Sequence, residues 1–353
     1  MQNSVSVYYA ESLEKIADNL REIKPNVMTA VPRLLEKVYD KIYARGAELS
    51  GIKQKLFYWA VDLGLQYEPY GENGAWYEFK LKIAKKLILS KWKEALGGNL
   101  ELIASGSAAL QPRLARVFTA AGMTLVEGYG LTETSPVISV NDMRKNKFKI
   151  GSVGQIIDGV HVKIAKDGEI LCKGPNIMMG YYKDLEKTAE VMTDDYFHTG
   201  DIGEIDEQGF LKITDRKKEM FKTSGGKYIS PQVIENVMKQ SLFIEQIMVV
   251  GDGRKMPTAL IQPNVEYVMK WLADNGTPSN SLEEACKQES LLEALQKEIE
   301  NHNEKFGSWE RIKKFELIPE EWSIDGGHLT PTMKLKRKVV KEKYIAIIEK
   351  MYS

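Results

Sequence analysis

Hydrophobic residues recur at helical spacing through the first hundred positions of this chain. The clearest case is residues 32–49 (PRLLEKVYDKIYARGAEL), which start with a proline, a residue suited to the first turn of a helix. Residues 99–105 and 123–128 are short apolar runs that predict strands, and residues 111–122 between them predict a helix. A strand, a helix and a strand in succession indicate a parallel sheet of the α/β class, which we place in a domain spanning residues 1–150.

After residue 150 the pattern changes to short strands separated by turn signals. The dipeptides Asp167-Gly168 and Gln208-Gly209 are typical of hairpins, so residues 151–215 predict an antiparallel β subdomain. The joint near residues 216–219 is charged and has no apolar core residue, as an interdomain boundary does. Residues 216–353 then predict a small α+β domain. Its expected elements are a helix from Pro231, strands at 245–250 and 257–262, and helices at 281–303 and 335–350.

Composition narrows the class of protein. A chain of 353 residues with 43% hydrophobic residues is long enough for two or three domains with real cores. Its formal net charge of zero argues against a nucleic-acid partner. Cys172 and Cys286 make neither a disulfide framework nor a zinc site, which favours a reducing, cytoplasmic setting. The sequence shows neither a run of about eighteen apolar residues nor an N-terminal signal peptide, so we expect no membrane-spanning segment.

Residues 193–235 carry the most informative chemistry. Asp201 follows a His-Thr-Gly turn, and Arg216 lies fifteen residues later, across a predicted hairpin at 203–214 that returns it to the vicinity of Asp201. An ionised carboxylate accepts two hydrogen bonds, so Asp201 suits the two hydroxyls of a ribose. A surface salt bridge is the plainer alternative for the same pair.

A second cluster follows the predicted strand at 123–128. In residues 124–136 (TLVEGYGLTETSP), a Gly-Tyr-Gly turn lets the backbone approach a ligand closely. The hydroxyl of Thr132 and the carboxylate of Glu133 suit a phosphate oxygen and Mg²⁺, which prefers oxygen ligands. Taken by themselves, these residues also fit a polar turn such as any α/β protein has.

Both segments resemble motifs of one enzyme family. Residues 193–235 resemble the ribose-binding and hinge segment of the acyl-adenylate-forming enzymes, which include acyl-CoA synthetases, luciferases and the adenylation domains of peptide synthetases. Residues 124–136 resemble the strand and turn with which that family binds adenine, phosphate and metal. Residues 328–340 (HLTPTMKLKRKVV) resemble its C-terminal motif with the catalytic lysine.

The resemblance runs from about residue 8 to the C-terminus and implies an architecture. Residues 1–150 become a remnant of the family's large α/β N-terminal domain, 151–215 its antiparallel subdomain, and 216–353 its mobile C-terminal domain. The small residues at 105–110 (SGSAAL) resemble the family's segment near the adenine and acyl pocket, although small-residue turns are common. The implied nucleotide-binding residues are Gly106, Ser107, Ala108, Tyr129, Gly130, Thr132, Asp201 and Arg216, with Tyr129 stacking on adenine. Lys218 and Gly225 complete the implied cofactor-binding set.

Catalytic and moving parts also follow from the resemblance. Thr132, Glu133 and Lys334 are the implied catalytic residues, and Glu133 is the implied metal ligand. Thr332-Met333 replaces the family's usual Ser-Gly pair before the lysine, a departure that resembles long-chain fatty acyl-CoA synthetases. The rivals for the lysine's role are Lys336, Arg337 and Lys338.

Lys218 matches the family's hinge position, and Gly225 matches a turn that enters the active site when the thioester forms. Without the resemblance, Lys218 is one member of a solvated charge run and Gly225 one residue of a loop.

One family motif is missing from these residues. The Ser/Thr/Gly-rich phosphate loop that precedes the other motifs is not present, and the nearest string is TSGGK at 223–227. There Phe221 stands where a Walker-type loop needs its first glycine. We therefore expect this chain to be the C-terminal part of a longer enzyme.

The expected reaction has two halves. ATP and a carboxylate give acyl-AMP and pyrophosphate with Mg²⁺ present, and the thiol of CoA then displaces AMP. The favoured substrate is a long-chain fatty acid, because residues 8–42 and a helical insertion before 105–110 also look long-chain-like. An acyl-carrier-protein ligase and a catalytically incompetent nucleotide- or acyl-binding fragment remain as alternatives; a helical interaction module is disfavoured by the ordered motifs.

Residues 76–96 (WYEFKLKIAKKLILSKWKEAL) predict a basic amphipathic helix. Trp76, Phe79, Ile83, Leu87, Ile88 and Trp92 are expected near one face, with lysines over much of the other. Such a helix fits either packing against a core or peripheral contact with an anionic membrane. Exposed sheet edges in the N-terminal part are a further route to self-association as a homodimer.

Overall fold

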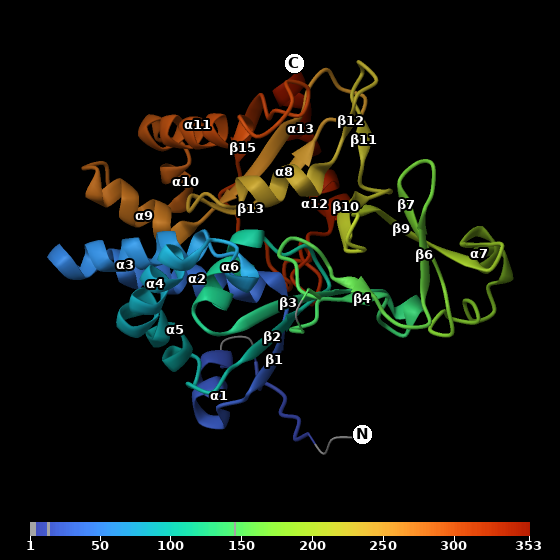
Figure 1. Ribbon diagram of the computed structural model, residues 1–353. Coiled ribbons are helices and arrows are strands. Elements are labelled where there is room, and N and C mark those ends of the chain that lie inside the picture. Colours follow the sequence, from blue (N-terminus) through green and yellow to red (C-terminus); the bar gives the residue numbers. More distant parts are fainter. Residues whose placement is uncertain (1–4, 13–14, 145) are drawn as a thin grey trace. The chain divides into compact units, whose positions relative to one another are not determined.

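The computed structural model describes residues 5–12, 15–144 and 146–353. The chain forms two compact units, and Figure 1 labels its helices and strands. The first comprises Met1–Val160, Pro175–Met178 and Asp206–Lys212, and the second comprises His161–Gly174, Met179–Ile205 and Ile213–Ser353. The predicted division at residues 150 and 215 stays a prediction.

The first unit contains a five-stranded sheet in the order β1-β2-β3-β4-β5. Strands β1, β2 and β3 run parallel, and β4 and β5 continue the sheet antiparallel. The strands are β1 (Val27–Ala30), β2 (Leu102–Ser105), β3 (Thr124–Tyr129), β4 (Ser139–Val140) and β5 (Gln155–Ile156). The parallel part with its intervening helix α6 (Pro112–Ala120) confirms the α/β class.

Helices bury one large core against this sheet. They are α1 (Ile16–Ile23), α2 (Pro32–Ala47), α3 (Gly51–Leu65), α4 (Ala75–Ala84), α5 (Ser90–Ala95) and α6, with short 3₁₀ turns at Pro69–Gly71 and Thr132–Thr134. Helix α2 begins at Pro32 as predicted, because proline's missing amide costs nothing in the first helical turn. Leu35 of α2, Ile103 of β2 and Phe118 of α6 are all 0% exposed in the same hydrophobic cluster.

The helix predicted at 76–96 forms, but its apolar residues do not share one face. Trp76 and Phe79 are 70% and 54% exposed, whereas Trp92 is 3% exposed. A helix turns roughly 100° per residue, so Trp76 and Trp92, which are sixteen positions apart, would project from nearly opposite sides of a regular helix. A π turn at Lys85–Leu89, between α4 and α5, interrupts the regular spacing as well. The prediction of a single apolar face is therefore wrong.

The second unit contains most of an antiparallel sheet in the order β10-β9-β7-β6, with β8 paired to β9; the first two residues of β10 are assigned to the first unit. Its strands are β6 (His161–Ile164), β7 (Glu169–Lys173), β8 (Met192–Thr193), β9 (Tyr196–Ile205) and β10 (Leu211–Arg216), and α7 (Leu185–Glu190) lies between β7 and β8 in the sequence. Gly168 and Gly209, the glycines of the two predicted turns, have φ of +87° and +80°. Glycine adopts this left-handed region without a steric penalty, so both turns form where predicted.

The same unit ends in a small α+β part. A hairpin of β11 (Phe221–Lys222) and β12 (Tyr228–Ile229) precedes a three-stranded sheet of β13 (Ile244–Val250), β14 (Thr258–Pro263) and β15 (Lys314–Leu317). Its helices are α8 (Pro231–Met238), α9 (Val265–Asp274), α10 (Leu282–Ala285), α11 (Glu289–Asn303), α12 (Arg337–Lys343) and α13 (Ile345–Tyr352). This combination of parallel, antiparallel and small α+β parts confirms the predicted fold class.

The two long helices expected near the C-terminus are each broken. The first divides into α10 and α11 because Gln288 is extended, with φ −74° and ψ 128°. The second divides into α12 and α13 at Tyr344, whose φ of −106° and ψ of 22° lie outside the helical region. Among the described residues, no helix is both long and apolar enough to cross a membrane.

Candidate functional site

The turn after β3 carries two of the predicted catalytic residues, Thr132 and Glu133. Thr134 is fully buried and holds the turn: its Oγ1 accepts the amide of Leu131 at 2.9 Å and donates to the carbonyl of Pro136 at 3.0 Å. Thr132 is exposed and Glu133 is half-buried. A β-carbon at Gly130 would lie 1.7 Å from the carbonyl oxygen of Pro136, so the turn requires a glycine there.

The segment after β2 lies at the same edge of the parallel sheet. Ser105 of β2 is in register with Glu127 of β3, so Gly106–Ala108 and the Tyr129–Glu133 turn both follow the carboxyl ends of neighbouring strands. Ligands of α/β proteins bind beyond these ends. Ser107 and Ala108 are exposed, and Ser107 has a φ of +71°. The first unit thus gathers the predicted adenine- and phosphate-binding residues in two adjacent loops.

Beneath these loops lies a buried carboxyl group that sequence reasoning missed. Glu127 is 8% exposed, and burial raises the pKa of its carboxyl to about 8, although the backbone amide of Leu110 acts in the opposite direction. The hydroxyl of Ser105 beside it has no hydrogen-bond partner among the described residues. No sequence pattern marks Glu127 as buried, because it lies in a strand directly before a polar turn.

In the second unit, Asp201 of β9 and Arg216 of β10 form an ion pair. Arg216 Nε lies 3.1 Å from Asp201 Oδ1, and the aspartate side chain is 11% exposed whereas that of Arg216 is 42% exposed. The hairpin between β9 and β10 therefore returns Arg216 to Asp201. The guanidinium of Arg216 is thus the more exposed partner of the pair.

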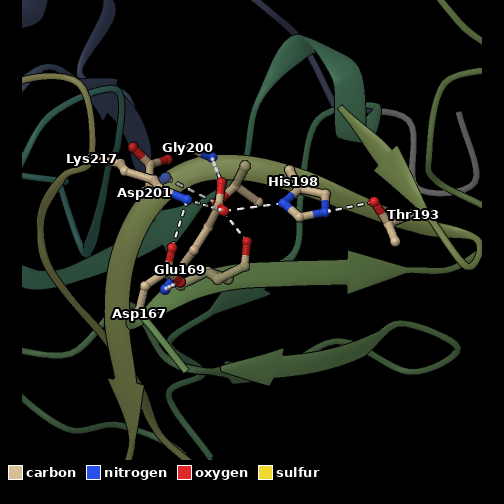
Figure 2. Close-up of polar contacts among 9 residues, drawn as sticks. Asp167, Glu169, Thr193, His198, Gly200, Asp201 and Lys217 are labelled. Carbon is tan, nitrogen blue, oxygen red and sulfur yellow. Dashed lines mark hydrogen bonds and ion pairs between the residues drawn. The ribbon is translucent and has the colours of Figure 1, made fainter. Parts of the chain in front are cut away.

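A second missed carboxylate, Glu169, organises the segments that carry this pair (Figure 2). Its side chain is 5% exposed and accepts the Gly200 amide at 3.0 Å and Lys217 Nζ at 2.8 Å. His198 Nδ1 also lies 3.0 Å from Glu169, and its Nε2 lies 3.2 Å from the Thr193 hydroxyl. Burial alone raises the pKa of Glu169, but these hydrogen bonds hold it below its usual value. Sequence reasoning could not single out Glu169, since its partners lie 29 to 48 residues away along the chain.

The predicted hinge lies immediately after Arg216. Lys218 is exposed, and the amides of Glu219 and Met220 donate to the Arg216 carbonyl at 2.8 and 3.1 Å. Gly225 is exposed in the β11–β12 hairpin, where the Gly226 amide donates to the Thr223 carbonyl at 2.9 Å. Both residues thus lie in turns, as a hinge and a mobile loop require.

Lys334 projects from a short closed loop. The Thr330 amide donates to the Lys334 carbonyl at 2.7 Å, and the Lys334 amide donates to the Thr330 hydroxyl at 3.0 Å. Burial lowers the pKa of Lys334, nearby Arg216 lowers it further, and Glu219 and Asp201 raise it. Lys334 therefore lies within electrostatic reach of the Asp201–Arg216 pair.

The rival basic residues are placed differently. Arg337 donates to Glu235 at 2.6 Å and to the Val249 carbonyl at 2.6 Å. Lys338 is 90% exposed and Lys336 is also exposed. The pKa of Lys334, by contrast, is lowered by Arg216 and raised by Asp201.

Comparison with known proteins defines the class that this fold and these motifs represent. The model of the AMP-binding enzyme family matches residues 4–182, and the model of the AMP-binding enzyme C-terminal domain matches residues 219–353. The chain belongs to the family of AMP-binding, adenylate-forming enzymes.

Relatives include two fatty-acid enzymes. The chain is 36% identical to a long-chain-fatty-acid–CoA ligase of Mycobacterium bovis, covering 99% of this chain and 58% of the relative. It is 32% identical to the peroxisomal long chain acyl-CoA synthetase 7 of Arabidopsis thaliana, covering 98% and 51%. The chain thus spans a little over half the length of these relatives.

Solved structures share the fold. The adenylation domain of a carboxylic acid reductase from Segniliparus rugosus, in complex with AMP and a co-purified carboxylic acid, matches with a TM-score of 0.72 at 23% identity. This match covers 96% of the chain and 49% of that structure. At this identity the likeness shows the adenylation-domain fold alone.

Proposed function

We propose that this chain serves an ATP-dependent ligase that converts a long-chain fatty acid into its CoA thioester. In the first half-reaction, a carboxylate oxygen attacks the α-phosphorus of ATP, and the bond to pyrophosphate breaks to leave acyl-AMP. In the second, the sulfur of CoA attacks the acyl carbon, AMP leaves, and the thiol proton is released. The observation that carries the proposal is the Asp201–Arg216 pair with Lys334 in electrostatic reach of it.

Nucleotide binding divides between two groups of residues. Asp201 accepts the ribose hydroxyls, and Arg216 holds the aspartate and the sugar beside it. Tyr129 stacks on adenine, and Gly106, Ser107, Ala108 and Gly130 let the nucleotide approach the backbone. The exposed hydroxyl of Thr132 binds a phosphate oxygen. These roles account for the chemistry of every residue in the predicted nucleotide set.

Glu133 is the residue that we assign to Mg²⁺. No group of three or more candidate ligands stands together in the part of the chain that the structure describes. A lone carboxylate fits Mg²⁺ nevertheless, because this ion is commonly bound by one or two carboxylates together with substrate phosphates and water. When bound, the ion neutralises charge on the phosphates.

Lys334 supplies a positive charge where negative charge develops on the α-phosphate. A preorganised cation in a partly desolvated site stabilises such charge more strongly than one in water does. Rotation at Lys218 then withdraws Lys334 and brings Gly225 forward for the reaction with CoA. No acid–base pair is needed for either half-reaction as written.

The exposed apolar residues of α4 support peripheral contact with an anionic membrane. Trp76 and Phe79 stack with ring centroids 5.5 Å apart and are both exposed, with Lys82 and Lys86 exposed on the same segment. Aromatic and basic side chains together suit the boundary of an anionic lipid layer. Sedimentation with anionic vesicles, lost in Trp76→Ser and kept with Trp309→Ser, tests this contact.

The decisive assay compares the chain with two lysine variants. Pyrophosphate release and acyl-CoA formation are measured with ATP, Mg²⁺, CoA and palmitate for the unaltered chain, Lys334→Ala and the control Lys336→Ala. Loss in Lys334→Ala alone supports the ligase. AMP binding without either product supports the alternative, a nucleotide-binding chain that does not catalyse adenylation. The assay is repeated with an acyl-carrier protein in place of CoA. Product formed with the carrier protein and not with CoA would identify the carrier protein as the acceptor.

A further inference from the structure

We propose that Glu169 is a positioning residue that fixes the ribose-binding pair and the chain directly before the hinge. The inference rests on the roles proposed above for Asp201, Arg216 and Lys218. Gly200 precedes Asp201, and Lys217 lies between Arg216 and Lys218. By binding Gly200 and Lys217, one carboxylate on β7 holds a neighbour of each functional residue (Figure 2).

The burial of Glu169 explains why its hydrogen bonds to Gly200 and Lys217 are strong. Its side chain is 5% exposed, and a buried carboxylate is costly unless donors surround it. Hydrogen bonds to an ionised group are roughly twice as strong as those between neutral groups. A carboxylate also fixes the tautomer of His198, since an ionised acid only accepts and Nδ1 must therefore donate. Nε2 lies 3.2 Å from the hydroxyl of Thr193, a group that can either donate or accept.

Lys217 is held at three points. Its Nζ lies 2.7 Å from Asp167 and 2.8 Å from Glu169, and its amide donates to the Gly200 carbonyl at 2.9 Å. The Gly200 amide in turn donates to Glu169, so side chains and backbone close a ring. Because Asp167 is 52% exposed, Glu169 is the dominant anchor of the two.

This anchoring determines where a rotation begins. A hinge concentrates a large change of backbone angles in very few residues. With Lys217 fixed, Lys218 is the first residue free to turn, and the backbone hydrogen bonds from Glu219 and Met220 to the Arg216 carbonyl cross it. Rotation at Lys218 breaks those turn bonds and leaves Glu169 and its partners in place. The ribose pair therefore keeps its geometry in both domain arrangements.

The test combines AMP affinity with local amide exchange in the full chain. The variants are Glu169→Gln, Lys217→Met and the double variant, and Glu190→Gln is the control because Glu190 is exposed in the same unit. Calorimetry gives the dissociation constant of AMP, and hydrogen–deuterium exchange is followed in peptides containing Gly200 and Lys217. We expect Glu169→Gln to weaken AMP binding ~10-fold and to speed exchange at Lys217 ~10-fold, as loss of a buried charged hydrogen bond does.

The outcomes separate this inference from the proposed function. We expect Lys217→Met to reproduce both effects, the double variant to add little, and Glu190→Gln to change neither. If the amide exchange at Lys217 is unchanged in Glu169→Gln, the positioning role of Glu169 is overturned, whether or not AMP binds. Faster exchange throughout β7 and β9 overturns the positioning role in favour of a general structural one. If the unaltered chain does not bind AMP, the proposed function fails, while the exchange data still test whether Glu169 holds Lys217 in place.

Discussion

Arg337 and Glu235 form a largely buried ion pair, with 2.6 Å between Nη1 and Oε1, that joins α12 to α8. The pair also binds β13, since Val249 donates its amide to Glu235 at 2.7 Å and accepts from Arg337 at 2.6 Å. Arg337 follows Lys334 by three residues. The pair therefore anchors the end of the loop that carries the proposed catalytic lysine.

Removing one partner of this pair is expected to destabilise the second unit strongly. Arg337→Met leaves Glu235 buried without its cation, and such changes cost about 3–5 kcal/mol. The double variant Glu235→Leu with Arg337→Met removes both charges and is expected to recover most of that loss. Urea denaturation followed by circular dichroism measures both. Lys338→Met, at a 90% exposed position, is the control; an equal loss there contradicts the assignment.

At position 333, glycine is expected to give a more stable protein than methionine or any other residue with a β-carbon. Its φ of +60° lies in the left-handed region, which costs a residue with a β-carbon roughly 1–2 kcal/mol. Met333→Gly removes this cost but makes the unfolded chain more flexible, so a net gain of about 0.5–1 kcal/mol is expected. Met333→Ala keeps the β-carbon and is the matched control. Thermal unfolding decides; a gain in Met333→Ala that equals the gain in Met333→Gly assigns the effect to the side chain.

Glu127 is expected to make stability fall as pH rises. Its folded pKa is raised from 4.5 to about 8, so between these values the folded protein keeps a proton that the unfolded chain has lost. Stability from this group is full below about pH 4.5 and declines by up to about 1.4 kcal/mol per pH unit above it.

The measurement compares Glu127→Gln with the unaltered chain. Glutamine keeps the shape without the titration, so the variant is expected to gain on the unaltered chain as pH rises from 5 to about 8. Urea midpoints at closely spaced pH values give the difference. Parallel pH curves for the two proteins contradict a raised pKa at Glu127.

Sequence reasoning succeeded where a local pattern determines the structure. The turns at Gly168 and Gly209 and the helix start at Pro32 follow from the backbone preferences of glycine and proline. The Asp201–Arg216 contact followed from the length of one hairpin. In each case the deciding interaction lies within a few residues or across a single turn.

It failed where distant residues decide. Neither Gln288 nor Tyr344 is a helix breaker by type, so the residue types at these positions do not predict where the helices end. Glu169 could not be singled out, because His198 and Lys217 reach it from 29 and 48 positions away. The burial of Glu127 likewise depends on how β2 and β3 pair.

Asp201 is expected to dominate ribose recognition. Asp201→Ala removes both acceptor oxygens and leaves Arg216 without its ion-pair partner, so AMP affinity is expected to fall roughly 10–100-fold. Asp201→Asn keeps one acceptor oxygen and should lie between the two. Asp195→Ala is the control, since Asp195 is 82% exposed and bound to Lys173 on the surface. Calorimetric titration with AMP ranks the four proteins, and circular dichroism confirms that each is folded. If Asp201→Ala binds AMP as tightly as the unaltered chain does, Asp201 is not the ribose-binding residue, because the variant lacks the one carboxylate of the Asp201–Arg216 pair.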